Sequence, residues 1–359
     1  MKKRILALLL VVTMVLSLAA CGKKDGKEEK KEAPSMYSVL EKANDMKNGV
    51  YEIALDTNFN GVLANTEYAM LDKISIKVNG TLESETKMSM AIAYKYGTMS
   101  DYAVLTTMVL DNEDIYFNIK QLKEAAVQLG TALANPTISM AAAFLPEGEY
   151  LKINQKEIEE YSSSLGVEVP VETDAANVAS QEVLQIALKH IVKLVENATK
   201  DITPALLSGT TDNVKMAITK ENLSAAIEAL EKVDFAAAYD EFIKEAEAVQ
   251  GAESTVKELK NSKENVVKEV KEMLAEAKTS ASTFEKFDFT LNTSVTGEAG
   301  KREVKEDVKF SVADATGAVD CTVSMNVKES IGDADKVVVP TDAVSFTDFM
   351  NSILSSFAE

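Results

Sequence analysis

Residues 72–97, DKISIKVNGTLESETKMSMAIAYKYG, decide the fold class because apolar and polar side chains alternate along them. Alternation with a period of two residues is the pattern of a strand with one covered face and one solvated face. Two such runs separated by a short polar break predict a pair of antiparallel strands. The apolar positions of the two runs are Ile74, Ile76, Val78, Leu82, Met88, Met90, Ile92, Tyr94 and Tyr96.

The same period of two recurs on both sides of a long helical region. Further strands are expected near 50–59, 102–110, 114–118 and 148–153, and again from residue 286 onward. Between about 176 and 282 the period changes to 3.6, which is typical of amphipathic helices. The sequence therefore predicts an α+β fold: a strongly curved antiparallel sheet, half-barrel-like, capped on its apolar face by amphipathic helices. We expect residues 36–359 to form a single domain, with the helical region at about 176–282 as an insertion.

The first 20 residues are expected to be a secretory signal peptide. Three basic residues, at positions 2–4, precede an apolar run from Ile5 to Leu18 that ends on small alanines. The run is shorter than the roughly 20 apolar residues that span a bilayer. The sequence LAAC, ending at Cys21, resembles the lipobox of bacterial lipoproteins. That resemblance implies that Cys21 carries a diacylglyceryl anchor and is the first residue of the mature chain.

A charged tether is expected at residues 21–35. Residues 22–32 are all Gly, Lys, Asp or Glu, a composition that cannot bury enough apolar surface to fold. Such a linker would hold the folded part roughly 20 Å from the anchor. We therefore expect an extracytoplasmic protein, attached to the outer face of the cell membrane through Cys21.

The charge and the cysteine content exclude several classes of partner and structure. The formal net charge is −19, and it becomes −22 once the three basic residues of the leader are removed. Nucleic acid and anionic lipid are poor partners for such a chain. With only Cys21 and Cys321 present, and the first used by the anchor, no intramolecular disulfide is expected. Cys321 alternates with apolar residues, so we interpret it as a buried, inert thiol.

One segment matches the ligand spacing of a calcium-binding loop. In DTNFNGVLANTE, the residues Asp56, Asn58, Asn60, Gly61 and Glu67 occupy positions 1, 3, 5, 6 and 12 of the EF-hand pattern. Only two of these residues are charged, and the residues before Asp56 alternate as a strand rather than a helix. A strand that runs into a Gly/Asn turn is therefore the favoured interpretation, and no metal site is predicted.

No catalytic constellation is found. Ser254 and Lys257 match the Ser-x-x-Lys pattern of penicillin-binding enzymes, but the companion motifs are absent and Ser254 is a candidate helix N-cap. His190 lies on the apolar stripe of a predicted helix, with no cysteine or second histidine to bind zinc. We expect a structural histidine, no cofactor and no enzymatic activity.

Several segments resemble the LolA/LppX-like lipoprotein-carrier family and related lipoproteins. They are LEKANDMKNGVYEIALDTNFNG, DNEDIYFNIKQL, GEYLKINQKEI and KVVVPTDAVSFTDFM, and the resemblance covers residues 37–165 and 284–350. It implies a curved antiparallel half-barrel whose concave apolar face is capped by helices. Some members of the family hold lipid or acyl chains in that cavity.

The apolar sheet face is the remaining candidate for function. We expect a non-enzymatic envelope lipoprotein that binds or carries a hydrophobic or lipid-like molecule between sheet and helices. The alternative is a structural or interaction lipoprotein with a closed core and no ligand. The solute-binding subunit of an importer would require alternating βαβ units, which the strand pattern contradicts. The predicted ligand-lining residues are Ile74, Ile76, Val78, Met88, Met90, Ile92 and Tyr94.

Overall fold

The computed structural model describes residues 48–63, 69–84, 86–164, 174–203, 205–315, 317–332 and 335–358, together with Ser35, Met36, Ser38, Val39, Lys42 and Met46. The predicted signal peptide, the anchor at Cys21 and the tether up to residue 34 lie outside these residues. Among the described residues that follow the tether, Met36, Ser38, Val39 and Lys42 are helical, whereas Ser35 and Met46 are not. None of the described helices is long and apolar enough to span a bilayer.

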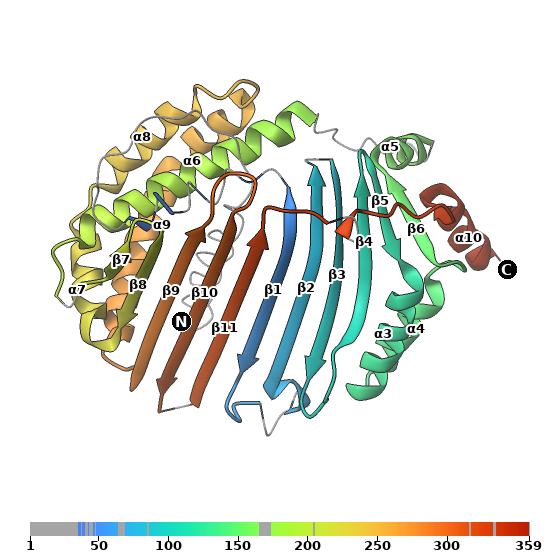
Figure 1. The fold of residues 1–359 in the computed structure, drawn as a ribbon, viewed down its shortest axis with the longest axis horizontal. Coiled ribbons are helices and arrows are strands. Elements are labelled where there is room, and N and C mark those ends of the chain that lie inside the picture. The colour runs from blue at the N-terminus through green and yellow to red at the C-terminus, as the bar shows by residue number, and fades with distance from the viewer. Residues whose placement is uncertain are drawn as a thin grey trace. The chain divides into compact units, whose positions relative to one another are not determined.

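The fold is α+β, as predicted, with a 12-stranded, mostly antiparallel sheet. Hydrogen-bonded neighbours follow the order β12-β6-β5-β4-β3-β2-β1-β11-β10-β9-β8-β7 (Figure 1). Contacts group the chain into two compact units. Unit 1 contains residues 172–298 and 302–320 with the described positions up to 46, and unit 2 contains residues 47–171, 299–301 and 321–359. The prediction of a single domain stays a prediction.

The prediction of a strongly curved, half-barrel-like sheet is wrong, because the sheet of neither unit is strongly curled or closed. Strong curvature requires bulges or glycine kinks repeated across several strands. In unit 2 the β2–β3 and β3–β4 pairings each contain one register shift, after Leu82 and after Ile92. The β1–β2 pairing runs over ten residue pairs without one.

Unit 2 is an antiparallel meander, as the alternation predicts. Its strands are β1 (Gly49–Asn58), β2 (Lys73–Ser84), β3 (Lys87–Tyr96), β4 (Ala103–Asp111), β5 (Asp114–Asn118), β6 (Tyr150–Asn154), the part of β11 (Gly317–Lys328) from Cys321 onward, and β12 (Ala343–Ser345). An acidic turn joins β4 to β5, with Asn112 at φ +56°, a conformation that Asn tolerates better than most residues. The short β12 was not predicted; it pairs in parallel with β6.

The helical elements of unit 2 are the 3-10 turns η1 (Ala69–Asp72) and η2 (Ala142–Phe144) and the helices α3 (Ile119–Ala132), α4 (Pro136–Ala141), α5 (Gln155–Ser164) and α10 (Phe346–Ala358). Several of the helices begin at side-chain caps that the sequence supplies, whereas η2 has no such cap. Asn118 caps α3 by accepting from the Gln121 amide. Asn154 caps α5, since its side chain accepts from the Lys156 amide at 2.9 Å.

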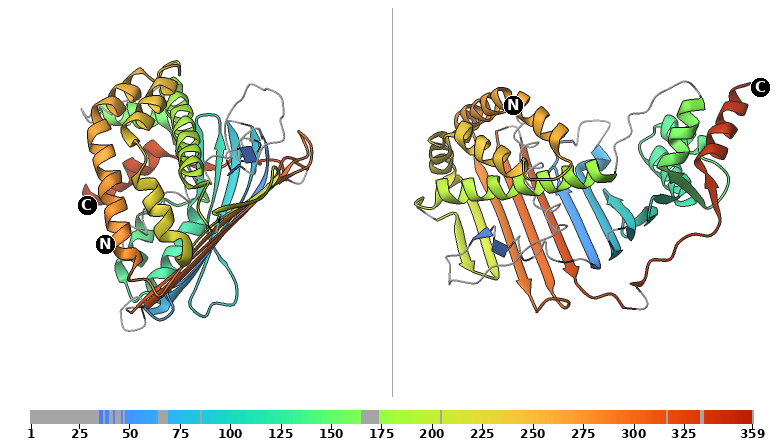
Figure 2. Two further views of the ribbon diagram at one scale, coloured as in Figure 1. Left: turned by 90° about the vertical axis from the view of Figure 1, so that its left-hand side faces the viewer. Right: turned by 90° about the horizontal axis from the view of Figure 1, so that it is seen from above.

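The chain between β11 and β12 forms a strap on one face of the meander. Val337 packs in a buried cluster with Val109 of β4 and Tyr116 of β5. Its amide donates to the Glu83 carboxylate at the end of β2, at 3.1 Å. Val109 and Tyr116 pair across β4 and β5, so they share a face. Helix α3 packs on β4 and β6, and in Figure 2 the helices and the strap of unit 2 lie on different sides of its strands.

Unit 1 combines a smaller antiparallel sheet with the predicted helical region. Its strands are β7 (Leu207–Thr210), β8 (Asn213–Thr219), β9 (Lys286–Thr296) and β10 (Glu303–Asp314), and its helices are α6 (Asp174–Thr199), α7 (Lys220–Glu231), α8 (Phe235–Ala246) and α9 (Glu253–Ala281). Asp234 caps α8, because its carboxylate accepts from the amides of Ala236 and Ala237. The prediction of Ser254 as a cap is wrong, since α9 begins at Glu253 and its N-cap is Ala252.

The core of unit 1 is closed. Helices α6, α8 and α9 share a buried apolar cluster that includes Val183, Phe242 and Val256. On the sheet, β9 places every second residue in the interior, and Leu291 and Val304 are fully buried. Unit 1 therefore buries the centre of its apolar sheet face, while Met216 and Ile218 on β8 keep intermediate exposure.

Candidate functional site

The predicted ligand-lining residues lie on one face of the β2–β3 pair. The register joins Ile76 with Tyr94 and Val78 with Ile92. Residues directly opposite each other in an antiparallel pair point to the same side of the sheet, and so does every second residue along each strand. Ile74, Met88 and Met90 occupy such alternate positions and therefore point to the same side. The structure therefore brings all seven residues together, and their role as ligand-lining residues stays a prediction.

The same face continues over the neighbouring strands without a charged side chain. We call it the apolar face of unit 2. The register assigns to it Tyr51, Ile53 and Leu55 of β1, Ile74, Ile76, Val78, Gly80 and Leu82 of β2, Met88, Met90, Ile92, Tyr94 and Tyr96 of β3, Thr106, Met108 and Leu110 of β4, and Ile115 and Phe117 of β5. Charged residues of these strands, such as Lys77 and Lys95, alternate onto the opposite face.

The apolar face of unit 2 is only half-buried. Of the seven predicted residues, Tyr94 is buried at 8% exposure, and the other six keep intermediate exposure. The equivalent face of unit 1 is different, since Phe289 is 2% exposed and Leu291 is 0% exposed. Two sheet faces with the same alternation thus end in different environments: β9 buries its apolar side chains, whereas most of those on β2 and β3 remain partly accessible.

Helix α3 covers the apolar face at its β3–β4 end, where Tyr94 supplies a polar contact. The Tyr94 hydroxyl donates to Gln128 Oε1 of α3 at 3.3 Å, and the ring stacks on Tyr96 with centroids 6.1 Å apart. Burial, followed by the nearby Tyr96, raises the pKa of the Tyr94 phenol. The phenol is therefore neutral at physiological pH and acts as a hydrogen-bond donor at this edge.

A glycine allows one aromatic ring to lie across the apolar face. Gly80 of β2 pairs with Tyr51 of β1 and with Met90 of β3. A Cβ at Gly80 would stand 2.4 Å from the Tyr51 ring and 2.2 Å from the Ser89 carbonyl oxygen. The ring uses this space to reach over β2, and its hydroxyl donates to that carbonyl at 3.3 Å. Tyr51 therefore cross-links β1 to β3 on the candidate ligand face.

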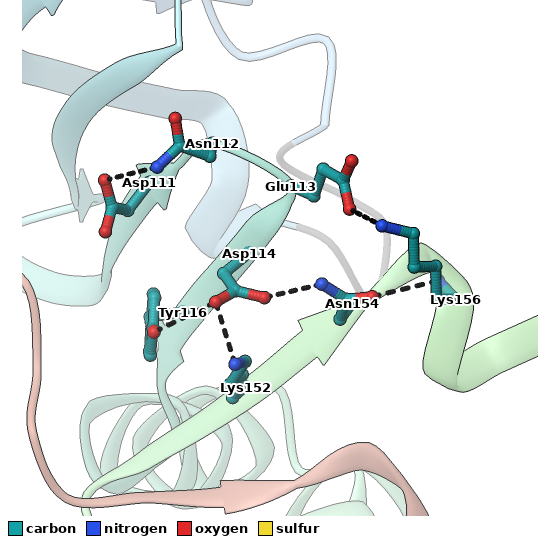
Figure 3. Close-up of polar contacts among 8 residues, drawn as sticks. All are labelled: Asp111, Asn112, Glu113, Asp114, Tyr116, Lys152, Asn154 and Lys156. Carbon is teal, nitrogen blue, oxygen red and sulfur yellow. Dashed lines mark hydrogen bonds and ion pairs between the residues drawn. The ribbon is translucent and has the colours of Figure 1, made fainter. Parts of the chain in front are cut away.

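The opposite face carries a polar cluster at the β5–β6 pair, shown in Figure 3. Asp114 accepts from Lys152 Nζ at 2.8 Å, from Asn154 Nδ2 at 2.6 Å and from the Tyr116 hydroxyl at 3.4 Å. Burial opposes ionisation of Asp114, but these donors, led by Lys152, lower the pKa of its carboxyl. Lys156 pairs separately with Glu113. Because the donors satisfy the Asp114 carboxylate, this cluster fixes strand register and the start of α5 and leaves no free acid or base.

The calcium-like segment is a strand and a turn, as the favoured interpretation predicts. Asp56 lies in β1 and accepts from the Ser75 hydroxyl at 2.5 Å. Asn60 and Gly61 follow at φ +51° and +84°, and the Gly61 amide donates to the Asp72 carboxylate at 2.9 Å. Glu67 lies outside the described residues. No group of three His, Cys, Asp or Glu side chains among the described residues is placed to hold a metal ion.

The structure also shows the environment of the Ser-x-x-Lys pattern, of the single histidine and of Cys321. Ser254 and Lys257 are exposed on the first turn of α9. His190 contacts Glu245 through Nε2 at 2.8 Å and meets the Phe242 ring edge-on, which supports its interpretation as a structural histidine. Cys321 is half-buried and accepts from the Thr57 hydroxyl, and burial raises the pKa of its thiol.

Sequence reasoning missed Glu306, a buried acid in unit 1. Its side chain is 4% exposed on β10, and no hydrogen bond or ion pair joins it to a described residue. Its register partner on β9 is Thr293, which is 0% exposed and whose hydroxyl has no hydrogen-bond partner among the described residues. The sequence already indicated the orientation of Glu306. Val304, Glu306 and Val308 are alternate residues of one strand, so Glu306 points to the same apolar side as the two valines.

Comparison with known proteins finds no family model, no curated protein and no solved structure that matches this chain. The resemblance to the LolA/LppX-like family therefore stays a prediction from sequence pattern. Function is inferred from the geometry and chemistry of the apolar face of unit 2.

Proposed function

We propose that this chain is a non-enzymatic, lipid-anchored envelope protein that binds a hydrophobic or lipid-like molecule against the apolar face of unit 2. One observation carries the proposal. A broad face of large apolar side chains, free of charge, keeps intermediate exposure in the folded chain, whereas the central strands of the unit 1 sheet bury theirs, as at Phe289 and Leu291. Exposed apolar surface of this extent is typical of a binding surface.

The chemistry of the face favours an acyl-like ligand. Covering apolar surface gains roughly 25 cal/mol per Å² of area removed from water. Met88, Met90 and Met108 lie side by side across β3 and β4, and their unbranched, polarizable side chains adapt to ligands of varied shape. Because no cation or anion lies on the face, a charged head group would find no ion-pair partner there. The face suits the hydrocarbon part of an amphiphile.

The proposed anchor at Cys21 would place this face near a source of such ligands. Two acyl chains provide lasting membrane attachment without help from the protein surface. The folded part would then remain free to approach lipids or lipid-modified proteins of the same membrane, within the reach of the charged tether.

Binding of a fluorescent fatty-acid probe tests the proposal. The protein is the full chain with Cys21→Ser, which blocks lipid attachment. Ile92→Lys places a charge in the middle of the apolar face, next to Val78, and should abolish probe binding. Ala91→Lys is the matched control: it adds the same side chain one residue earlier, on the opposite face of β3. Far-UV circular dichroism confirms that both variants remain folded.

Mass spectrometry of lipids that co-purify with the folded protein identifies the natural ligand class. Saturable probe binding, lost in Ile92→Lys and kept in Ala91→Lys, supports the proposal. If the parent protein binds no probe and carries no lipid, the proposal fails, and a structural or interaction lipoprotein becomes the better description.

A further inference from the structure

The Tyr51 ring interrupts the apolar face of unit 2 along β2. On this strand the face consists of alternate residues, namely Ile74, Ile76, Val78, Gly80 and Leu82. Among the described residues that form the face on β2 to β5, Gly80 alone has no side chain. The Tyr51 ring fills the space above it, because its Cζ and its hydroxyl oxygen both lie 2.4 Å from the place of a Gly80 Cβ.

The ring completes a line of long side chains across five strands. Gly80 pairs with Tyr51 of β1 on one side and with Met90 of β3 on the other. Met90 pairs with Met108 of β4, which in turn pairs with Phe117 of β5. Residues paired in this way lie side by side on one face of the sheet. The line therefore crosses the whole apolar face at the level of Gly80.

The accessible part of the apolar face runs along β2. Toward β4 the face is covered by α3, and there Tyr94 is 8% exposed and Thr106 is 4% exposed. By contrast, all the face residues of β2 keep intermediate exposure. The Tyr51 hydroxyl donates to the Ser89 carbonyl oxygen of β3 at 3.3 Å, so the ring lies directly across this accessible stretch.

We propose that Tyr51 is a specificity-determining residue that limits the length of the acyl chain bound on the apolar face of unit 2. This inference rests on the proposed function. With a rise of about 3.3 Å per residue, β2 offers roughly 13 Å from Ile74 to Val78 and roughly 26 Å from Ile74 to Leu82. The ring leaves only the shorter stretch continuous. A longer acyl chain therefore keeps its end in water.

Removal of the ring joins the two parts of the face. Tyr51→Ala opens the space above Gly80, and a long chain can then pass from Val78 to Leu82. Each additional methylene group that leaves water strengthens binding about fourfold. The variant should therefore gain affinity for long acyl chains, although it has lost an apolar side chain of its own.

Displacement of the fluorescent fatty-acid probe by decanoate, laurate, myristate and palmitate measures the chain-length preference. The protein is again the full chain with Cys21→Ser. The parent protein should bind laurate and palmitate about equally. Tyr51→Ala should bind palmitate at least about tenfold more tightly than laurate.

Three further variants separate the barrier from a merely structural role of the ring. Tyr51→Phe keeps the ring and should keep the preference of the parent protein. Tyr51→Leu still covers β1 but is too short to pass over Gly80, so it should show the same gain for palmitate as Tyr51→Ala. Ile53→Ala is the matched control, because Ile53 lies on the same face of β1 opposite Val78. It should weaken binding of all four acids by a similar factor. Thermal melts confirm that each variant is folded.

The outcomes distinguish this inference from the proposed function. An unchanged ratio of laurate to palmitate affinity in Tyr51→Ala and Tyr51→Leu would overturn the inference and leave the proposed function intact. The inference would also be wrong if the parent protein already preferred palmitate, or if Ile53→Ala produced the same gain. A parent protein that binds no probe would remove the proposed function, and this inference with it.

Discussion

Glu306→Gln tests the energetic consequence of burying an unpaired carboxyl group. Among the described residues, Glu306 is the only charged side chain that is buried. Burial, and secondarily the negative charge of Asp307, raise the pKa of the Glu306 carboxyl from 4.5 to about 7. Glutamine has nearly the same shape and cannot ionise, so the substitution removes the titration without opening a cavity.

The sign of the pH dependence follows from the two pKa values. The folded chain holds the Glu306 proton up to about pH 7, whereas the unfolded chain releases it near 4.5. Between these values the folded state binds more protons, so its free energy of unfolding falls as the pH rises. At about 1.4 kcal/mol for each pH unit between the two pKa values, the loss amounts to ~3 kcal/mol above pH 7. That is a large fraction of the stability of a typical domain, roughly 5–15 kcal/mol.

Urea unfolding at a series of pH values from 4.5 to 8 measures this effect. Relative to the parent protein, Glu306→Gln should gain ~3 kcal/mol in free energy of unfolding at pH 8 and little at pH 4.5. Glu303→Gln is the control, because Glu303 lies on the same strand beside Lys305 on the other face. Amide hydrogen exchange of the β9 and β10 peptides localises the change to unit 1.

The reasoning would be refuted if Glu306→Gln and the parent protein lost stability in parallel between pH 4.5 and 8. Parallel curves would mean that the carboxyl group is solvated or paired in solution. A Glu303→Gln variant with the same gain would instead assign the effect to net charge.

Three further predictions concern unit 2 and the anchor. Gly80→Ala should destabilise the fold by about 1–3 kcal/mol, because the new methyl group meets the Tyr51 ring and the Ser89 carbonyl oxygen; thermal melts measure it, and an unchanged melting temperature contradicts it. Met90→Ala should lower the free energy of unfolding by less than the ~2–5 kcal/mol expected in a closed core, since Met90 is only half-buried, and it should weaken binding of a fatty-acid probe. A larger loss of stability, with no probe binding in the parent protein, would argue for a closed core. Cys21→Ser should release the protein or leave its precursor uncleaved, as membrane fractionation would reveal, whereas unchanged lipid labelling would exclude the lipobox interpretation.

Local patterns in the sequence predicted the elements and the faces of the strands well. The alternation in residues 72–97 gives β2 and β3, and it places Ile76 and Ile92 on one face because side chains alternate strictly along a strand. The caps at Asn154 and Asp234 were also predictable, since each side chain accepts from amides within three residues. These features depend on neighbours in the chain, and the sequence by itself determines them.

Interactions between distant segments required the tertiary structure. The parallel pairing of β12 with β6 and the strap contact of Val337 with Glu83 join residues far apart in sequence, and a three-residue strand has no periodicity to detect. Curvature was mispredicted for the same reason, because it depends on how bulges and twist combine over many strands.

Whether an apolar face is covered was decided only by tertiary packing. Phe289 and Ile92 have the same alternation in sequence, yet the first is buried in unit 1 and the second remains half-exposed in unit 2. Alternation fixes which side a residue faces, but it carries no information about which distant helix will pack there. In the same way, alternation along β10 places Glu306 on the apolar side of its strand. Its nearly complete burial comes from the packing of unit 1, and that burial raises the pKa of its carboxyl.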